Sequence, residues 1–251
     1  MKYKLFIDPG HGGTDNGATA TNGELEKDIN LEVALYLKSL LEPYSELIEV
    51  IMARTDDVTM SLGERVRKAN TRQADLYLSI HHNAFNGKAD GAEVIHSIHG
   101  GRGKEFAHLI MNEFLRFNNK RRVFSKESNN DDNKDYFFVI RHSQMPAVIT
   151  EAVFLDSKDF ESMDETHERV GQAEGLLRAI LSYFEIEPIE VIEFADDEEI
   201  SDYAKEAVVT TVENGIMSGF PDGTFKPKES VTREQLATVI HNLLKLFEDW
   251  D

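Results

Sequence analysis

Short apolar runs and longer amphipathic stretches alternate along the first 184 residues of the chain. The short runs predict strands at residues 3–8, 47–54, 75–81, 91–97 and 146–151. The stretches between them carry apolar residues every three or four positions, which predicts helices at residues 26–41, 61–73, 104–117 and 167–184. Strands that alternate with helices in this order predict an α/β fold with a mostly parallel sheet flanked by helices on both faces.

The pattern changes near residue 185. Residues 185–193 form an acidic stretch that contains a proline and lacks helical periodicity, so we interpret them as a linker. This linker separates a domain at residues 1–184 from a small helical domain at residues 194–251. Residues 185–251 carry 17 acidic and 5 basic side chains, a net charge of −12, against −7 for the remainder.

Composition excludes several classes of function. The chain has no cysteine, which excludes disulfides, thiolate metal ligands and cysteine nucleophiles. Any metal site must therefore use His, Asp or Glu. The net charge of −19 argues against a nucleic-acid partner, because phosphate binding depends on an excess of Lys and Arg. No apolar run approaches the roughly 20 residues of a membrane span, so we expect no membrane partner.

The amino terminus lacks the features of an export signal. A signal peptide has a basic start, an apolar stretch of about 7–15 residues and a small-residue cleavage site. Here the apolar run at residues 4–7 is short and is interrupted by Asp8, Pro9 and Gly10. We therefore expect no signal peptide, and a protein that stays in the cytoplasm until it is released.

Histidine and glutamate residues stand at the predicted element ends. His11 follows the first strand, His81 and Glu151 end later strands, and Glu26 opens the first long helix. Carboxyl ends of parallel strands share one edge of a sheet, so these groups converge there. Two His, one Glu and a further carboxylate suit a zinc hydrolase without cysteine. The pattern alone leaves ordinary loop and helix-dipole roles equally open. His82 competes with His81, but strand alternation lets only one of them point into the site.

Motifs in a fixed order resolve this ambiguity. Asp8–Gly13, Glu26–Asp28, Ser79–Ala84 and Pro146–Glu151 resemble, in the same order, motifs of the zinc-dependent N-acetylmuramoyl-L-alanine amidases of the type 3 family. The resemblance covers about residues 2–184. It implies an enzyme that cleaves bacterial peptidoglycan between the lactyl group of N-acetylmuramic acid and L-alanine of the stem peptide.

The resemblance also implies roles for individual residues. His11, Glu26 and His81 are the expected Zn²⁺ ligands, and Glu151 is the expected catalytic carboxylate. Glu151 would take a proton from the attacking water and deliver it to the leaving amine. Arg141 matches a position where the family often carries arginine. Since stem peptides carry carboxylates that arginine binds well, Arg141 is a candidate substrate-binding residue. Asn83, within the Ser79–Ala84 motif, is the second candidate. A structural role for Arg141 stays open.

Residues 194–251 resemble a single S-layer homology module. The match is carried by Gly219–Phe225 and by Thr232, Arg233 and Glu234. This family anchors proteins to secondary cell-wall polymers, generally in sets of three modules. A lone module leaves two partners open, namely the secondary cell-wall polymer or further copies of this chain.

The leading hypothesis is therefore a peptidoglycan amidase with an appended wall-associated module. We favour an endolysin, which accumulates in the cytoplasm and is released by a membrane-permeabilising partner, over an autolysin exported by another route. One alternative is a zinc peptidase that cuts within the stem peptide. Another is a non-catalytic cell-wall-binding protein on a degenerate amidase scaffold.

Overall fold

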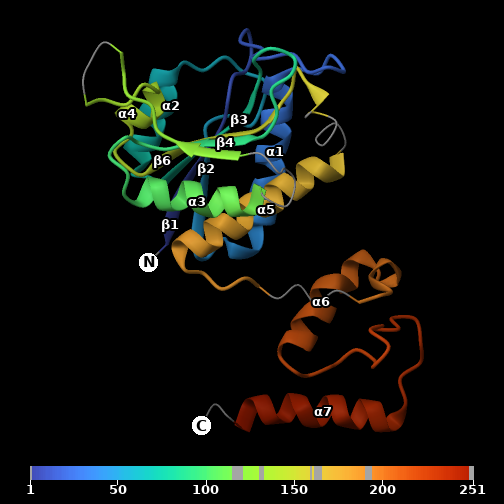
Figure 1. Cartoon of the computed structure of the whole chain (residues 1–251). Helices are drawn as coiled ribbons and strands as arrows, with labels where there is room; N and C mark the ends of the chain where they lie inside the picture. Colours follow the sequence, from blue (N-terminus) through green and yellow to red (C-terminus); the bar gives the residue numbers. More distant parts are fainter. Residues whose placement is uncertain are drawn as a thin grey trace. The chain divides into compact units, whose positions relative to one another are not determined.

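The structure is a computed structural model that describes residues 2–114, 121–129, 133–158, 160, 166–189 and 194–248. The chain divides into two compact units, Met1–Pro188 and Ile189–Asp251. The first unit contains a sheet and its flanking helices, and the second contains a small helical segment (Figure 1). Within the described residues, no helix combines the length and the apolar character that crossing a membrane requires.

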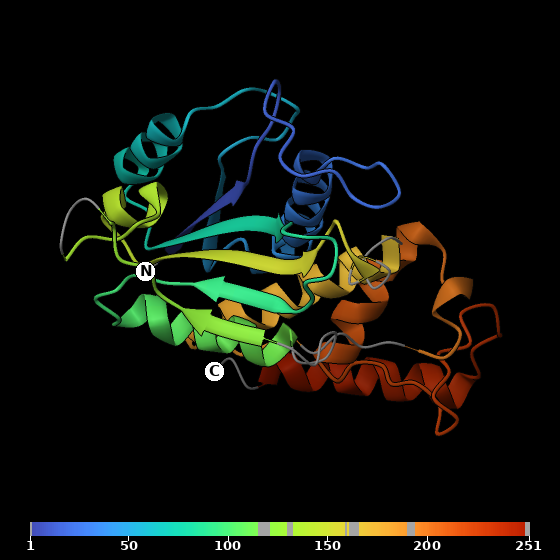
Figure 2. The ribbon, with the colours of Figure 1, turned by 45° about the horizontal axis from the view of Figure 1, so that its top comes forward.

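A six-stranded sheet forms the centre of the first unit, with strand order β2-β1-β3-β6-β4-β5 (Figure 2). The strands are β1 (Tyr3–Pro9), β2 (Ile48–Met52), β3 (Leu76–Asn83), β4 (Ala92–Ile95), β5 (Arg121–Phe124) and β6 (Ala147–Phe154). Strands β2, β1, β3 and β6 are parallel, whereas β4 runs antiparallel to β6 and parallel to β5. The carboxyl ends of β1, β3 and β6 therefore lie at one edge.

Helices cover both faces of the sheet. One face packs against α1 (Glu26–Leu40), α3 (Arg102–Phe114) and α5 (Thr166–Phe184), and the other against α2 (Leu62–Arg72) and α4 (Phe138–His142). A short 3₁₀ helix, η1 (Glu42–Tyr44), follows α1. The expected fold class is confirmed.

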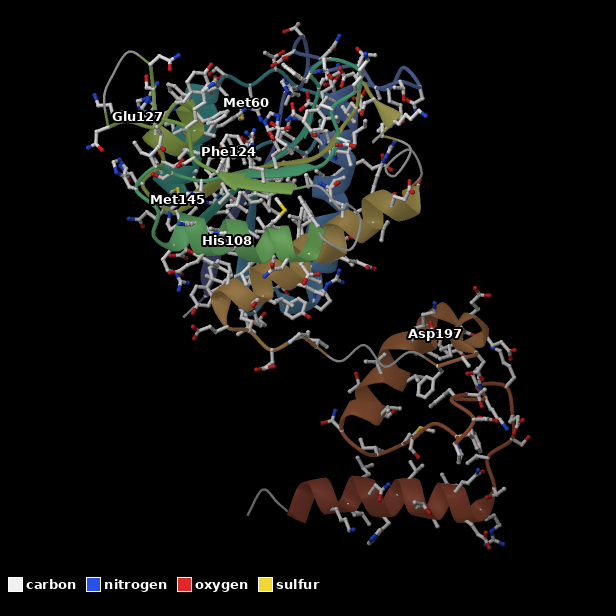
Figure 3. The ribbon with its side chains drawn as sticks, in the orientation of Figure 1. Met60, His108, Phe124, Glu127, Met145 and Asp197 are labelled. Atoms are coloured by element: carbon white, nitrogen blue, oxygen red, sulfur yellow. The ribbon has the colours of Figure 1, made fainter. Side chains whose placement is uncertain are left out.

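Strand alternation divides the apolar residues between two cores. In β1, Leu5 and Ile7 belong to the core under α1, α3 and α5, and Phe6 belongs to the core under α2 and α4. Because β1 is buried on both faces, its sequence is a continuous apolar run rather than an alternating one. Partly buried residues extend the second core, among them Met60, Phe124 and Met145, which are labelled in Figure 3.

The direction of β4 departs from a purely parallel arrangement. Only residues 84–91 connect it to β3, whereas a parallel crossover needs a dozen residues or more. The chain therefore turns back, and β4 pairs antiparallel with β6. Strand β5 and helix α4 have no counterpart among the elements that the sequence predicts, because both are short.

Strands β3 and β6 extend further than the sequence predicts. The prediction that His81 and Glu151 end their strands is wrong, since β3 reaches Asn83 and β6 reaches Phe154. Ala152, Val153 and Phe154 are buried, so the apolar pattern continues beyond the glutamate. Glu151 therefore stands within a strand rather than at its end.

The second unit contains η3 (Asp197–Glu199), α6 (Asp202–Glu213) and α7 (Arg233–Glu248). Its buried apolar residues include Ile200, and the Phe194 and Phe225 rings lie 5.0 Å apart. Residues 190–193 of the expected linker lie outside the described residues.

Candidate metal centre

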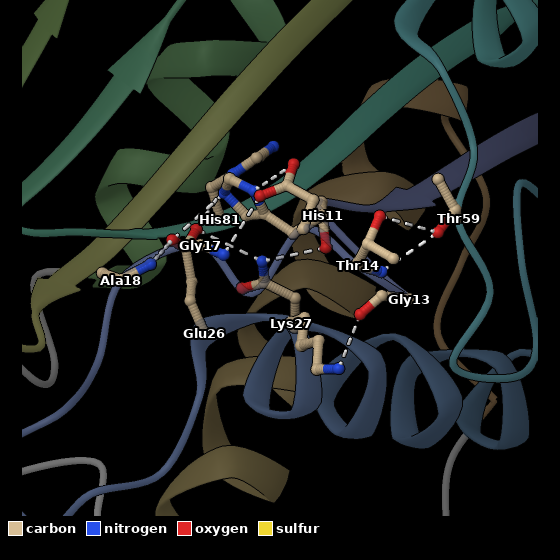
Figure 4. A network of polar contacts seen from close by, with 12 residues as sticks. His11, Gly13, Thr14, Gly17, Ala18, Glu26, Lys27, Thr59 and His81 are labelled. Carbon is tan, nitrogen blue, oxygen red and sulfur yellow. Dashed lines mark hydrogen bonds and ion pairs between the residues drawn. The ribbon is translucent and has the colours of Figure 1, made fainter.

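His11, Glu26 and His81 form a cluster of potential metal ligands. One ligand atom from each residue lies within 4.8 Å of the others. His11 Nε2 is 3.1 Å from Glu26 Oε2, and His81 Nδ1 is 3.0 Å from Glu26 Oε1 (Figure 4). The residues come from the loop after β1, the first position of α1 and strand β3, so the parallel topology brings them together.

The loop after β1 is folded tightly enough to hold His11 against the helix. The backbone of His11 itself has a positive φ of 59°. Gly17 also has a positive φ, of 65°, and a Cβ atom there would lie 2.5 Å from Glu26 Oε2. Glycine is therefore required at position 17, both for the backbone conformation and for the close approach to the ligand.

Glu26 is buried, and it is held in its ionised form. Burial opposes ionisation, but hydrogen bonds with His11 and His81 and their positive charges outweigh it, so the pKa of Glu26 lies far below its ordinary value. The backbone N–H groups of Ala18 and His82 donate to the same carboxylate, at 2.9 and 3.2 Å. A carboxylate surrounded by donors in this way is a ready metal ligand.

Asp15 orients the first histidine. Its Oδ2 is 2.9 Å from His11 Nδ1, on the opposite side of the ring from Glu26. Burial lowers the pKa of His11, but Glu26 and Asp15 outweigh this effect, so the pKa is raised overall. Metal-binding histidines usually have a carboxylate or carbonyl on the second ring nitrogen, which fixes the tautomer and the ring orientation. Asp15 stands at this position beside His11, at ion-pair distance.

The donor set fits a divalent metal of the zinc type. Two imidazoles and one carboxylate supply nitrogen and oxygen ligands, and this number of protein ligands leaves a coordination position open in catalytic zinc sites. The convergence of these side chains agrees with the roles that the sequence predicts for them.

Glu151 lies beside this cluster. It is the register partner of His81 in the pairing of β3 with β6. Its Oε2 is buried and has no hydrogen-bond partner among the described residues. Burial, together with the negative charges of Glu26 and Glu93, raises the pKa of Glu151 well above its ordinary value. A buried carboxyl group with an unused oxygen next to a metal-ligand cluster is suited to proton transfer.

His82 points away from the cluster. Its Nδ1 is 2.7 Å from Asn30 Oδ1, and its Nε2 is 3.1 Å from Gln172 Oε1. Burial lowers the pKa of His82 to about 4, so this imidazole is neutral at pH 7. Of the two adjacent histidines, His81 therefore belongs to the cluster, and His82 belongs to the packing between the sheet and the helices.

The two candidate substrate-binding residues lie in different places. Asn83 ends β3, where its Nδ2 donates to Glu93 Oε2 at 3.1 Å. Arg141 is on α4 and lines a cavity of about 720 Å³ together with Lys134 and Ala147. Ala147 begins β6, so the structure does not bring Arg141 to the end of the strand that carries Glu151. Both assignments remain predictions.

Several residues around the cluster were not anticipated from the sequence. They are Asp15, and two buried arginines, Arg54 and Arg65, whose side chains donate to the backbone of the loop after β1. Arg65 also pairs with the buried carboxylate of Asp8. The spacing of Asp15 four residues after His11 is a weak signal. Arg65 ends the Leu62–Arg65 segment, which also resembles the amidase family, but this resemblance does not indicate burial. For Arg54 there is no signal, because charged residues are ordinarily exposed.

Comparison with known sequences identifies the first unit. Residues 5–182 match the sequence model of the Amidase_3 family, N-acetylmuramoyl-L-alanine amidase. The chain belongs to this family. The expected enzyme class is thereby confirmed: the protein is a peptidoglycan hydrolase of the amidase type and acts on the cell wall.

Individual relatives agree with this assignment. N-acetylmuramoyl-L-alanine amidase CwlM of Bacillus licheniformis is 36% identical over 181 residues, which are 70% of this chain and 68% of that protein. An endolysin of Bacillus phage SPP1 is 35% identical over 166 residues, 63% of this chain and 57% of the endolysin. The catalytic domain of the amidase CwlV of Bacillus (Paenibacillus) polymyxa superposes with a TM-score of 0.65 at 27% identity, covering 74% of this chain and 100% of that domain.

The second unit also has a match. Residues 193–237 match the S-layer homology domain. The resemblance of the carboxyl-terminal residues to such a module is confirmed, and the amidase therefore carries a domain of a family associated with the cell surface.

Proposed function

We propose that this amidase hydrolyses the amide between N-acetylmuramic acid and L-alanine, with Zn²⁺ held by His11, Glu26 and His81. The observation that supports the proposal most directly is the convergence of these three side chains within 4.8 Å. The buried, unpartnered oxygen of Glu151 beside them adds the second functional group that amide hydrolysis needs.

Zinc bound by these residues would acidify a water molecule and polarise the scissile carbonyl. Glu151 acts as the proton carrier. In its ionised form it takes a proton from the attacking water as the oxygen adds to the amide carbon. It then gives that proton to the leaving nitrogen of L-alanine, and the carbon–nitrogen bond breaks. The products are a free lactyl carboxylate and a free amine.

The remaining residues of the site keep these groups in place. Glu26 stays ionised because its neighbours hold its pKa low. The Asp15 carboxylate lies 2.9 Å from Nδ1 of His11, and Nε2 of the same ring faces Glu26.

Zymography on peptidoglycan gels tests the proposal. Exhaustive chelation should abolish the cleared band, and stoichiometric Zn²⁺ should restore it. Full activity after verified removal of zinc would refute the metal assignment. A stem-peptide peptidase is separated by the products, since amidase action exposes a new amino-terminal L-alanine, whereas a cut within the peptide exposes another residue.

Asn83 and Arg141 are proposed to contact the substrate. Arginine suits the carboxylates of the stem peptide, and Arg141 lines an open cavity that also contains Lys134. Arg141→Ala should raise KM for peptidoglycan fragments with little change in kcat. An unchanged KM would remove Arg141 from the substrate-binding residues.

We also propose that the amidase works as an endolysin, held in the cytoplasm until a membrane-permeabilising partner releases it. Its similarity to the endolysin of phage SPP1 supports this role. Fractionation of the native host tests it: an endolysin is intracellular until lysis, whereas an exported autolysin is found in the wall fraction of growing cells.

Residues 194–251, after the linker at 185–193, are proposed to bind either a secondary cell-wall polymer or further copies of the chain. One observation favours self-association. Leu236, Ile240 and Leu244 of α7 are 48, 49 and 57% exposed, and they lie at helical spacing on one stripe. Sedimentation of the full chain, with Ile240→Glu as the variant, tests self-association, and co-sedimentation with purified walls tests polymer binding.

A further inference from the structure

Arg54 is buried beneath the metal-ligand cluster, although arginine is a charged residue. Only 3% of its surface is exposed. It follows β2, and its guanidinium group reaches the loop after β1 and the start of α1. Its Nη2 atom donates to two carbonyl oxygens, that of Gly10 at 2.9 Å and that of Lys27 at 2.7 Å. One nitrogen therefore joins two segments of backbone that are distant in the sequence.

These two carbonyls belong to the direct neighbours of metal-site residues. Gly10 precedes His11, and Lys27 follows Glu26. The same Gly10 donates its N–H to the carbonyl of Ile80 at 2.9 Å, and Ile80 precedes His81. The peptide groups on either side of Gly10 thus connect the backbones of the His11 and His81 segments, and Arg54 extends the connection to the segment of Glu26.

The other hydrogen bonds of Arg54 also go to backbone carbonyl oxygens. Its Nε donates to the carbonyl of Pro9 at 3.1 Å, and its Nη1 donates to the carbonyl of Asp56 at 3.2 Å. Among the described residues, none of its hydrogen bonds goes to a carboxylate. Burial and the nearby positive charge of Arg65 lower the pKa of Arg54, but arginine remains protonated in proteins.

A buried cation that is hydrogen-bonded only to neutral carbonyls reduces the stability of the fold. Desolvating a charge is costly, and replacing buried charges by well-packed apolar residues often stabilises a protein. A positive charge close to a cation site also opposes metal binding by simple repulsion. The negative charges of Asp8, Asp57 and Asp28 favour a cation here, but among the described residues none of these carboxylates bonds to Arg54. Attraction alone would be met equally by lysine and therefore does not explain the choice of arginine. Its planar fork of donors, which can hold several carbonyls in fixed relative positions, does explain it.

We propose that Arg54 is a positioning residue for the metal site, which fixes the backbones of the His11 and Glu26 segments relative to each other and thereby sets metal affinity. The inference rests on the proposed zinc site. Lysine cannot replace arginine in this role, because a single ammonium group has no planar fork that spans these carbonyls. The geometry of the guanidinium group, rather than its charge, carries the effect.

Zinc affinity of the purified full chain tests the proposal. Arg54→Lys and Arg54→Met are compared with Arg72→Lys and Arg72→Met, since Arg72 is a half-exposed arginine on α2 paired with Glu49. Zn²⁺ dissociation constants are measured by competition with a chromophoric chelator, and Co²⁺ absorption spectra report the ligand geometry. Circular dichroism and Tm of the metal-free proteins establish that each variant is folded.

We expect Arg54→Lys to raise the zinc dissociation constant about 10- to 100-fold, the usual effect of losing a residue that orients a metal ligand. Its Co²⁺ spectrum should change, and the Arg72 variants should match the wild type. If Arg54→Met fails to fold, Arg54→Lys decides the question because it keeps the charge and most of the volume. A folded Arg54→Lys protein with wild-type zinc affinity and spectrum, even at lower Tm, would overturn the proposal. Absence of zinc binding by the wild type would instead refute the proposed function.

Discussion

A methyl group on Gly10 would lie 2.1 Å from Cε1 of His81. The loop after β1 therefore passes so close to the imidazole that only glycine fits beside it. The same residue accepts a hydrogen bond from Arg54 and donates one to Ile80, so the contact is fixed from several directions.

Gly10→Ala should displace His81 from the cluster. Because the new methyl group meets a packed ring, the ring or the loop has to move, and a misplacement of about 1 Å at a reacting centre costs on the order of 100-fold in rate. Peptidoglycan hydrolysis under saturating zinc measures the effect. Gly63→Ala is the matched control, since a Cβ at Gly63 meets no heavy atom within 4 Å. Equal rates for the two variants would contradict the close approach.

Glu151→Gln should abolish turnover while leaving zinc binding intact. Glutamine keeps the size and polarity of the side chain but cannot accept a proton, and loss of such a carrier typically costs about 10²- to 10⁴-fold in kcat. Turnover of peptidoglycan fragments and zinc content are measured on the same preparation. Glu113→Gln, on α3, serves as the control. A Glu151→Gln enzyme with nearly full activity would refute the assignment of Glu151 as the proton carrier.

His82 should make the protein less stable in mild acid. Burial lowers its pKa to about 4 in the folded state, from an ordinary value of 6.5, so between these values the unfolded chain binds more protons. The free energy of unfolding therefore falls as pH falls through this window, by up to about 3 kcal/mol. Above pH 6.5 the stabilising contribution of His82 is complete.

Urea titrations between pH 4 and 7 measure this dependence. A His82→Asn variant lacks the titrating group, so its stability should fall less steeply on acidification than that of the wild type. Both proteins are compared without metal, so that zinc release does not add to the slope. Parallel slopes would show that His82 is not the group responsible.

Arg169 should contribute to stability through two carboxylates. The arginine, only 5% exposed, bonds Glu32 at 2.5 Å and Glu24 at 2.7 Å, and so ties α5 to α1 and to the loop before it. Arg169→Met should cost about 1–3 kcal/mol, a modest value because both glutamates remain partly exposed. Urea denaturation measures the change. Arg72→Met should cost no more than about 0.5 kcal/mol, and a similar cost for both variants would contradict the prediction.

Much of this site can be predicted from the sequence, because its functional residues belong to motifs that occur in a fixed order along the chain. His11, Glu26 and His81 were identified from element ends and motif order, and the structure brings the three together. The positions of Glu151 within β6 and of β4 in the sheet were not predicted correctly. Both depend on pairing between strands, which local patterns do not specify.

The amino-acid sequence by itself determined the family, the alternation of strands and helices, and the residue types available for chemistry, since these follow from periodicity and ordered motifs. Only the tertiary structure decided which neighbour each side chain has. It separated His81 from His82 and placed Arg141 along a cavity at the far end of β6. It also buried Arg54 between two ligand-bearing segments. Such contacts join residues distant in the chain, so they arise only when packing fixes the distances between elements.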